Sequence, residues 1–159
     1  MTHFIVDAML GKLTLWLRLT GHDTFYSTEI HDDEMLRIAE RENRVLLTAD
    51  EELFERSQQR GINALLLRGT VDERVARVFS EFNIRPHIDP SNSRCSKCNG
   101  TLEELSNTTK VKIKDLVHEQ TYNHYDKFWY CSDCQSVYFQ GGQWENITEY
   151  MERIRGLLG

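Results

Sequence analysis

A chain of 159 residues with 40% hydrophobic side chains is long enough for one domain, or for a small domain with an appendage. It contains no apolar run near the roughly 18 residues that span a bilayer, and no basic and apolar signal-peptide pattern at its start. The formal net charge of −6 disfavours nucleic-acid binding over the whole surface, so any such contact is expected to be local. These features predict a cytoplasmic protein with no membrane partner.

Short apolar runs alternate with amphipathic stretches in residues 1–88, the first predicted domain. The first run, Phe4 to Val6, has no polar alternation, which is typical of a strand covered on both faces. Strands alternating with helices predict an α/β fold, in which a parallel sheet has helices on both faces. We expect strands at 4–6, 24–26, 45–47 and 64–67, and helices at about 11–20, 32–43, 51–61 and 71–82. We also interpret Thr48 to Glu51 as a capping box that starts the third helix.

Residues 89–93 are expected to form a linker, and residues 94–159 a zinc-ribbon domain with a C-terminal helix. The second part contains Cys95-x-x-Cys98 and Cys131-x-x-Cys134. Two such pairs can hold one Zn²⁺ in a closed tetrahedral site, which predicts a structural zinc, and residues 99 and 100 suit a left-handed turn after the first pair. The alternative is a redox dithiol pair, although this is expected beside a βαβ pattern.

Carboxylates follow two of the predicted strands. Asp7 ends the first strand, Asp50 follows the third, and Asp32 and Asp33 begin a helix that should start at the same edge of the sheet. If the first and third strands are neighbours, these groups repel one another unless a cation joins them. Oxygen ligands of this kind predict Mg²⁺ or Mn²⁺. The competing interpretation is that Asp50 and Asp32 are helix caps and that Asp7 forms a turn.

Two groups of basic residues are candidates for substrate binding. Lys12 follows Asp7 closely enough to approach a bound phosphate, and Arg18 lies on the same helix. The alternative for each is a solvated helix charge. Lys110, Lys112 and Lys114 are followed by aromatic residues and are predicted to cradle single-stranded RNA, with a solvated β-hairpin as the alternative. Residues 1–90 carry 11 basic and 16 acidic side chains, against 8 and 9 in residues 91–159, so we expect RNA contact to need the second part.

Many residues of the chain match one known family, in order. They are Asp7, Met9 to Leu13, Trp16 to Arg18, Gly21 and Asp23, then Asp33, Leu36 and Ala39, then Leu46 to Thr48, Asp50 and Leu53, then Arg94, Cys95, Cys98 and Asn99, and last Cys131, Cys134, Val137 and Tyr138. Together they resemble the Mut-seven C-terminal RNase domain family, a branch of the PIN-like nucleases. The likeness covers nearly the whole chain and includes both the nuclease half and the ribbon.

This resemblance implies a PIN-like Rossmannoid sheet, a metal-dependent RNase site and a zinc ribbon. Carried over by position, Asp7 and Asp50 are metal ligands, Asp33 or Asp32 is the third, and Thr48 contacts the metal or its water. The expected catalytic set is therefore Asp7, Asp32, Asp33, Asp50 and Thr48, with Asp7, Asp33 and Asp50 holding Mg²⁺ or Mn²⁺.

The sequence departs from the family pattern at three places. The family usually has a basic residue where Ala49 stands, and commonly another at Leu15. Its tryptophan-glycine-serine-histidine run near the end of the ribbon appears here as Gln140, Gly141, Gly142 and Gln143. Each departure removes a group that can touch RNA.

The resemblance predicts a metal-dependent ribonuclease that hydrolyses RNA phosphodiesters, with the zinc ribbon assisting the binding of RNA or of a protein partner. One alternative is a non-catalytic RNA-binding or assembly module with a vestigial acidic pocket. Another is phosphate transfer or a phosphatase activity on small molecules, because carboxylate sites on such sheets serve many chemistries.

Overall fold

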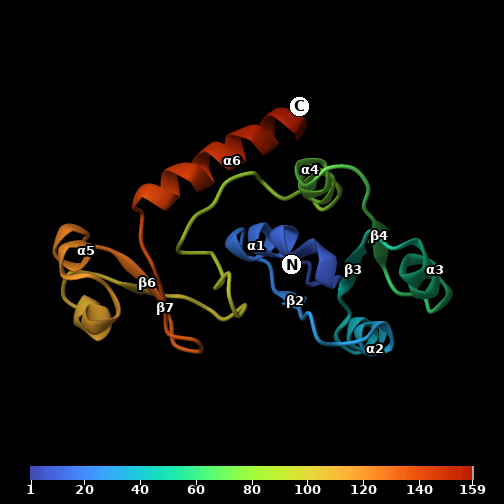
Figure 1. The fold of residues 1–159 in the computed structure, drawn as a ribbon, viewed down its shortest axis with the longest axis horizontal. Coiled ribbons are helices and arrows are strands. Elements are labelled where there is room, and N and C mark those ends of the chain that lie inside the picture. Colours follow the sequence, from blue (N-terminus) through green and yellow to red (C-terminus); the bar gives the residue numbers. More distant parts are fainter. Residues whose placement is uncertain (159) are drawn as a thin grey trace.

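Four parallel strands form the sheet of the first half of the chain (Figure 1). The computed structural model describes residues 1–158. The strands lie in the order β2-β1-β3-β4, with the bounds β1 Phe4–Val6, β2 Thr24–Tyr26, β3 Val45–Thr48 and β4 Ala64–Leu66. β1 and β3 are adjacent and parallel, with Ile5 opposite Leu46. The predicted parallel sheet and the pairing of the first and third strands are confirmed.

Helices cover both faces of this sheet, as predicted. Their bounds are η1 Ala8–Leu10, α1 Gly11–Leu19, α2 Asp32–Glu42, α3 Glu51–Gln59 and α4 Val71–Glu81, where η denotes a 3₁₀ helix. Along β1, Phe4 and Val6 pack in the core with α1 and α4, whereas Ile5 packs in the core with α2 and α3. All three side chains are completely buried, which explains why this strand has no polar alternation.

The first turn of α3 differs from the prediction. The segment from Thr48 to Glu51 is not a capping box, because Asp50 is the N-cap residue. The Asp50 carboxylate accepts hydrogen bonds from the amides of the second and third helical residues, at 2.8 and 3.3 Å. A capping box does occur at the start of α4, between Thr70 and Glu73. The prediction of a capping box at α3 is therefore wrong, and the one at α4 was not predicted.

The chain after the linker contains an antiparallel sheet in the order β5-β6-β7, two short helical segments and a long C-terminal helix (Figure 1). The bounds are β5 Glu103–Leu105, η2 Lys110–Leu116, α5 Glu119–His124, β6 Phe128–Cys131, β7 Ser136–Tyr138 and α6 Gly142–Leu158. The alternative of a β-hairpin over the lysine-bearing segment is wrong, since residues 110–124 form η2 and α5. Ile113 of η2 is fully buried with Leu105 and Phe128 in a small core of its own.

The C-terminal helix α6 packs on α4 (Figure 1). Met151 and Ile154 of α6 are buried in the core that α1 and α4 form on the sheet. Trp16 of α1 and Tyr150 of α6 stack with ring centroids 4.1 Å apart. The division of the chain at residues 88 and 94 stays a prediction, and α6 links the two parts. Within residues 1–158, no helix is both long and apolar enough to cross a membrane.

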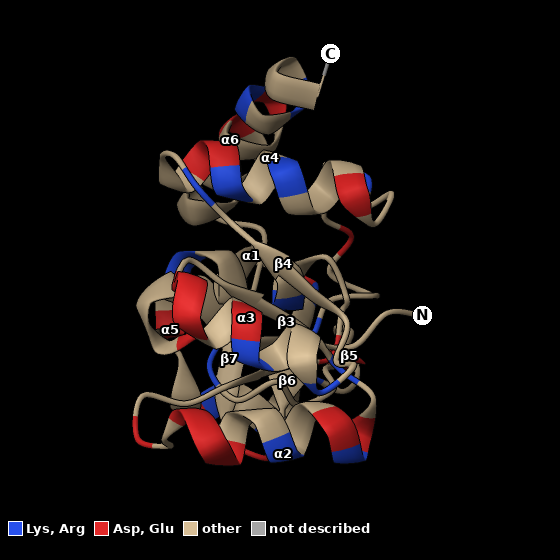
Figure 2. Cartoon of the chain, turned by 90° about the vertical axis from the view of Figure 1, so that its right-hand side faces the viewer, with Lys and Arg blue, Asp and Glu red and all other residues tan. Residues whose placement is uncertain are grey.

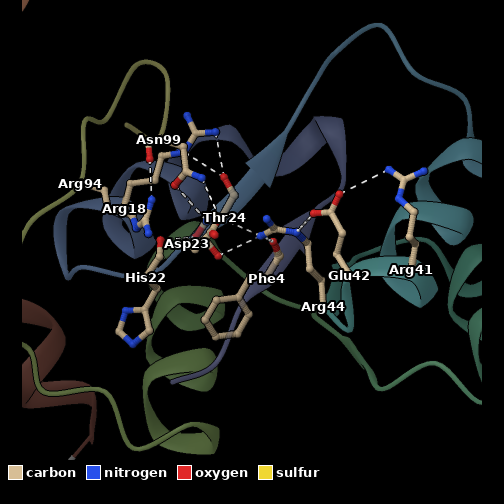
Figure 3. Close-up of polar contacts among 10 residues, drawn as sticks. All are labelled: Phe4, Arg18, His22, Asp23, Thr24, Arg41, Glu42, Arg44, Arg94 and Asn99. Carbon is tan, nitrogen blue, oxygen red and sulfur yellow. Dashed lines mark hydrogen bonds and ion pairs between the residues drawn. The ribbon is translucent and has the colours of Figure 1, made fainter. Parts of the chain in front are cut away.

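A polar network joins the ribbon to the amino edge of the parallel sheet (Figure 3). Arg44, which precedes β3, donates hydrogen bonds to Asp23 Oδ1 at 2.9 Å and to the carbonyl of Phe4 at 3.0 Å. Asn99 donates to the same Asp23 oxygen at 2.7 Å and accepts from the amide of Thr24 at 3.0 Å. Burial raises the pKa of the Asp23 carboxyl, but the hydrogen bonds from Arg44 and Asn99 outweigh this and lower it below its ordinary value.

Candidate active site and metal centre

Two predicted ligands, Asp7 and Asp50, lie at the carboxyl edge of the parallel sheet. Asp7 directly follows β1 and Asp50 is the second residue after the neighbouring strand β3. Thr48, the last residue of β3, connects them, because its hydroxyl donates to Asp7 Oδ2 at 2.8 Å and accepts from the amide of Asp50 at 3.0 Å. Thr48 is completely buried, so its hydroxyl holds the Asp7 carboxylate in a fixed orientation.

Asp32 and Asp33 of α2 are the two candidates for the third ligand, and the charges of Asp7 and Asp50 affect the pKa of Asp32. Burial raises the pKa of Asp32 above its ordinary value, and the charges of Asp7 and Asp50 raise it further. Asp33 instead forms an ion pair with Arg56, and 69% of its side chain is exposed. Asp7 and Asp50 therefore act electrostatically on Asp32, while Asp33 is the closer partner of Arg56.

Arg56 of α3 is a residue of this site that sequence reasoning missed. It pairs with Asp33, and its Nη1 atom lies 4.0 Å from Asp32 Oδ2. Acidic and basic positions are interspersed on α2 and α3 (Figure 2), and a second pair joins Arg60, the residue after α3, to Glu40 of α2. No motif marks Arg56, because its closeness to the carboxylates depends on how α2 and α3 pack on one face of the sheet.

Asp50 is a helix cap as well as a candidate ligand. Its Oδ1 atom accepts the two amide hydrogen bonds at the start of α3, and its Oδ2 atom has no hydrogen bond within residues 1–158. Asp7 precedes η1 but makes no side-chain cap bond there. Asp32 is the first residue of α2, whose N-cap is His31. The cap interpretation therefore accounts for one oxygen of Asp50 and for neither of the other carboxylates.

The donor set of this edge fits a hard divalent cation. Carboxylate oxygens are the preferred ligands of Mg²⁺ and Mn²⁺, and a cation would relieve the repulsion that raises the pKa of Asp32. Within residues 1–158, only the four cysteines place three or more Cys, His, Asp or Glu ligand atoms within 4.8 Å of one another. One ion that joins all three carboxylates therefore requires side-chain rotation or intervening water.

The four predicted zinc ligands meet at one point of the ribbon. The Sγ atoms of Cys95, Cys98, Cys131 and Cys134 all lie within 4.8 Å of one another. The distance is 3.6 Å from Cys95 to Cys134 and 3.4 Å from Cys98 to Cys131. Four sulfurs bound at about 2.3 Å from one zinc are about 3.8 Å apart in a tetrahedron. All four are free cysteines and not disulfides, so this cluster can bind zinc.

The turns after the cysteine pairs leave room for a metal ion. Asn99 and Gln135 have φ values of 73° and 59°, so the chain reverses in the left-handed region after each pair. The predicted left-handed turn is confirmed at Asn99, whereas Gly100 does not have a positive φ. Gly100 is needed for space, because a Cβ atom there would lie 3.0 Å from Cys131 Sγ and 3.2 Å from Cys98 Sγ. A side chain at this position would enter the metal site.

The pKa of the Cys95 thiol is lower than that of an ordinary cysteine. Burial raises the pKa of Cys95, but hydrogen bonds from the Tyr138 hydroxyl and from the amides of Cys98 and Lys97 outweigh burial and lower it to about 7. The Tyr138 oxygen lies 3.2 Å from Cys95 Sγ. Because the thiolate is the form that binds metal, these contacts favour metal binding at Cys95, whereas burial raises the pKa of the Cys98 and Cys131 thiols.

The two basic residues expected to guide RNA on α1 occupy different environments. Lys12, in the first turn, is exposed. Arg18 is buried, and its guanidinium donates to the carbonyl of Thr24 at 2.9 Å and to the carbonyl of Ser96 at 3.2 Å. Arg18 therefore ties β2 to the first cysteine pair. Its predicted contact with RNA is corrected to a structural role, because its donors are directed at protein carbonyls.

The three lysines of η2 are also not equivalent. Lys110 is 9% exposed and its Nζ atom donates to the carbonyl of Tyr122 at 2.6 Å, so its predicted RNA contact is corrected to a structural one. Lys112 is paired with Glu103 at 2.8 Å. Lys114 is exposed and has no ion pair among residues 1–158. The RNA contacts of Lys112 and Lys114 stay predictions.

The residues that depart from the family pattern lie in the core or at a pocket. Leu15 and Ala49 are partly buried and pack against the core that contains α1, α4 and α6. Gln140 and Gln143 line a pocket of about 290 Å³ between the ribbon and the start of α6. At Leu15 and Ala49, the core therefore gains apolar contact where the family usually has a charge.

Comparison with known proteins agrees with this arrangement. The family model described as "Mut7-C RNAse domain" matches residues 2–151, which include the carboxylate edge and all four cysteines. No curated protein and no solved structure matched the chain. The description of the family implies a nuclease-type role. Because the match extends over far more than half of the sequence, the chain belongs to the Mut7-C RNAse domain family.

Proposed function

We propose that the protein is a metal-dependent ribonuclease that hydrolyses RNA phosphodiesters at the carboxyl edge of the parallel sheet. The observation that carries this proposal is the buried Thr48 hydroxyl, which is hydrogen-bonded to the Asp7 carboxylate and to the Asp50 amide. Asp32 adds a third carboxylate whose pKa is raised by burial and by these two neighbours. The family match supports nuclease chemistry, and the dependence on metal rests on the carboxylates.

In this proposal, Asp7, Asp32 and Asp50 hold one or two Mg²⁺ or Mn²⁺ ions. When bound, such ions lower the pKa of a water molecule and neutralise charge on the phosphate. Thr48 orients the Asp7 carboxylate, and the amides at the start of α3 fix one oxygen of Asp50 while the other stays available. We prefer Asp32 to Asp33 as the third ligand because Asp33 is paired with Arg56.

We propose a structural role for zinc in the ribbon. Four thiolates leave no open coordination position, so a zinc ion there would stabilise the fold without taking part in hydrolysis. Arg18 and Asn99 tie the first cysteine pair to the sheet, so zinc would also set the position of the ribbon and let it assist RNA or partner binding. Free thiols agree with the predicted cytoplasmic location, which stays a prediction.

The test is cleavage of labelled single-stranded RNAs by the purified protein in Mg²⁺ or Mn²⁺. Asp7→Asn and Asp50→Asn should each reduce cleavage by more than about 100-fold. Loss of a residue that only supports a metal ligand costs about 10–100-fold, and loss of a ligand itself should cost more. Both variants should fold normally, since each removes one of several repelling charges. Cleavage that survives either substitution, or chelation by EDTA, would contradict the proposal. A wild-type protein that binds RNA without cutting it would favour the non-catalytic module.

A further inference from the structure

A pocket of about 410 Å³ lies beside the acidic edge, between η1, the start of α1, the end of β2 and the start of α4. Its lining includes Ala8, the residue after Asp7, and Tyr26, whose hydroxyl donates to the carbonyl of Ala8 at 2.5 Å. The pocket therefore opens at the same edge of the sheet as Asp7. Its charged lining residues are Lys12 and Arg74.

Both charged residues of this pocket are cations without an ion-pair partner. Within residues 1–158, no carboxylate oxygen lies within 4.0 Å of the Lys12 or Arg74 side-chain nitrogens. The Nε atom of Arg74 is buried and has no hydrogen-bond partner. Arg77, about one turn further along α4, differs because it pairs with Glu81 at 2.5 Å. Within residues 1–158 the Arg74 guanidinium makes no hydrogen bond to the protein either, so its terminal nitrogens can serve as donors to an anion in the pocket.

The carboxylates next to Arg74 in the sequence have their closest partners outside the pocket. Asp72 is held by Arg153 at 2.8 Å, and this hydrogen bond, with a weaker contribution from Lys12, lowers the pKa of the Asp72 carboxyl. Glu73 accepts a hydrogen bond from the amide of Thr70 in the capping box. Neither carboxylate therefore forms an ion pair with a pocket cation, although Asp72 offsets part of the Lys12 charge.

Apolar side chains are exposed at the same pocket. Met9 is 88% exposed and Val71 is 40% exposed, and both contribute to the lining. Cations beside exposed apolar groups match a nucleotide, because its phosphate is anionic and its base presents flat apolar faces.

We propose that Lys12 and Arg74 bind a phosphate of single-stranded RNA next to the scissile bond, with the adjoining base against Met9 and Val71. This inference rests on the proposed function and specifies where the RNA strand binds beside the active site. Cations are needed here because the neighbouring carboxylates repel the RNA backbone most strongly at this edge. The main RNA contact then moves from η2, where Lys110 is buried, to the acidic half of the chain.

The test compares RNA binding by variants that all carry Asp50→Asn, so that bound RNA is not consumed. A fluorescent single strand of about ten nucleotides is titrated in Mg²⁺ at several salt concentrations and followed by anisotropy. Arg74→Ala and Lys12→Ala should each raise Kd about tenfold. Each should also reduce the slope of log Kd against log salt by about 0.7, the value for one single-strand phosphate contact. Met9→Ser should weaken binding without changing the slope.

Arg77→Ala is the matched control, because Arg77 lies on the same helix in an exposed ion pair, and it should change neither Kd nor slope. Lys12 and Met9 are exposed, so their variants test the pocket even if Arg74→Ala folds poorly, and Arg74→Lys should preserve the slope. If the parent binds RNA and the Lys12 and Arg74 variants behave like Arg77→Ala, this inference is overturned while the proposed function stands. If the wild type does not cleave RNA and the parent does not bind it, the proposed function itself fails.

Discussion

The two edges of the parallel sheet shift the pKa of a nearby carboxylate in opposite directions. At the amino edge, Asp23 is held by Arg44 at 2.9 Å and by Asn99 at 2.7 Å, and these contacts lower its pKa (Figure 3). At the carboxyl edge, burial and two neighbouring carboxylates raise the pKa of Asp32. Polar groups that serve only stability are normally paired, whereas repelling charges are typical of functional sites. The contrast indicates a stabilising role for the amino edge, and it supports our proposal that the chemistry takes place at the carboxyl edge.

Removal of zinc should have the largest effect on stability. It should act on the ribbon, which contacts the amino edge of the sheet. Zinc binding contributes an apparent free energy of about 10–16 kcal/mol in zinc-finger peptides, so the ribbon should unfold on chelation. The parallel sheet should remain folded, because β1 is completely buried between two layers of helices. Hydrogen exchange should then show loss of protection in β6 but not in β1, and elemental analysis of the untreated protein should give one zinc per chain.

Cys134→Ser separates metal loss from effects of the chelator and should produce the same exchange pattern. Well under one zinc per freshly purified chain, or a disulfide between Cys95 and Cys98, would contradict the structural zinc. Simultaneous loss of protection in β1 and β6 would show instead that the ribbon and the sheet fold as one unit.

Asp23→Asn should have the next largest effect on stability. The substitution keeps the shape of the side chain but removes the charge opposite Arg44, whose side chain is 9% exposed. Exposed pairs contribute up to about 1 kcal/mol and breaking buried pairs costs about 3–5 kcal/mol, so we expect a loss of about 1–3 kcal/mol in the free energy of unfolding. Urea unfolding at pH 7 measures it, and an unchanged midpoint would argue against a stabilising amino edge.

The pH dependence of this loss follows from the lowered pKa of folded Asp23. A carboxyl whose folded pKa is depressed contributes stability that is complete above its unfolded pKa and is lost as pH falls through its folded pKa. The difference between wild type and Asp23→Asn should therefore be constant near neutrality and shrink in acid.

Local sequence patterns predicted the elements that define both edges. Unbroken apolar runs predicted the buried strands β1 and β3, and the alternation of strands and helices predicted a parallel sheet with Asp7 and Asp50 at one edge. Cysteine spacing predicted the cluster of four thiols. These predictions succeed because each depends on hydrophobic periodicity or on ligand spacing within a few residues.

The remaining features depend on contacts between distant segments. Arg18 belongs to a buried junction with Ser96, and Arg56 approaches Asp32 only because two helices share one face of the sheet. In residues 110–124, which form η2 and α5, Ile113 is buried in the ribbon core against Leu105 and Phe128, which lie on separate strands. No local pattern predicts such packing.

Thr48→Val tests how the Asp7 carboxylate is positioned at the carboxyl edge, because it removes only the hydroxyl between Asp7 and Asp50. Loss of this supporting contact should reduce RNA cleavage by about 10–100-fold. The melting temperature should fall by only a few degrees, since a hydrogen bond contributes about 1 kcal/mol. Thr48→Ser keeps the hydroxyl and should retain most of the activity. Equal activity of the two variants would show that the hydroxyl does not position Asp7.

Asp32→Asn should have the smallest effect and the opposite sign to Asp23→Asn. The folded pKa of Asp32 is raised, so the folded state binds the proton more tightly than the unfolded chain does. The stability linked to this group is therefore complete below its unfolded pKa and is lost as pH rises through its folded pKa. At pH 7 the charged side chain is unfavourable, and the neutral variant should be more stable by about 0.5 kcal/mol or less, because half of the side chain is exposed.

Asp33→Asn is the matched control for this last prediction, because the two aspartates are adjacent on α2 but only Asp33 is paired closely with Arg56. Removing the charge of Asp33 should leave stability unchanged or slightly lower it, whereas removing that of Asp32 should raise it in urea unfolding at pH 7. The gain from Asp32→Asn should also disappear as pH falls below the folded pKa of Asp32, since the wild-type carboxyl is then neutral as well. If Asp32→Asn destabilises the protein, or if both substitutions stabilise it equally, the carboxyl edge holds no specific repulsion, and the electrostatic argument for a cation there is lost.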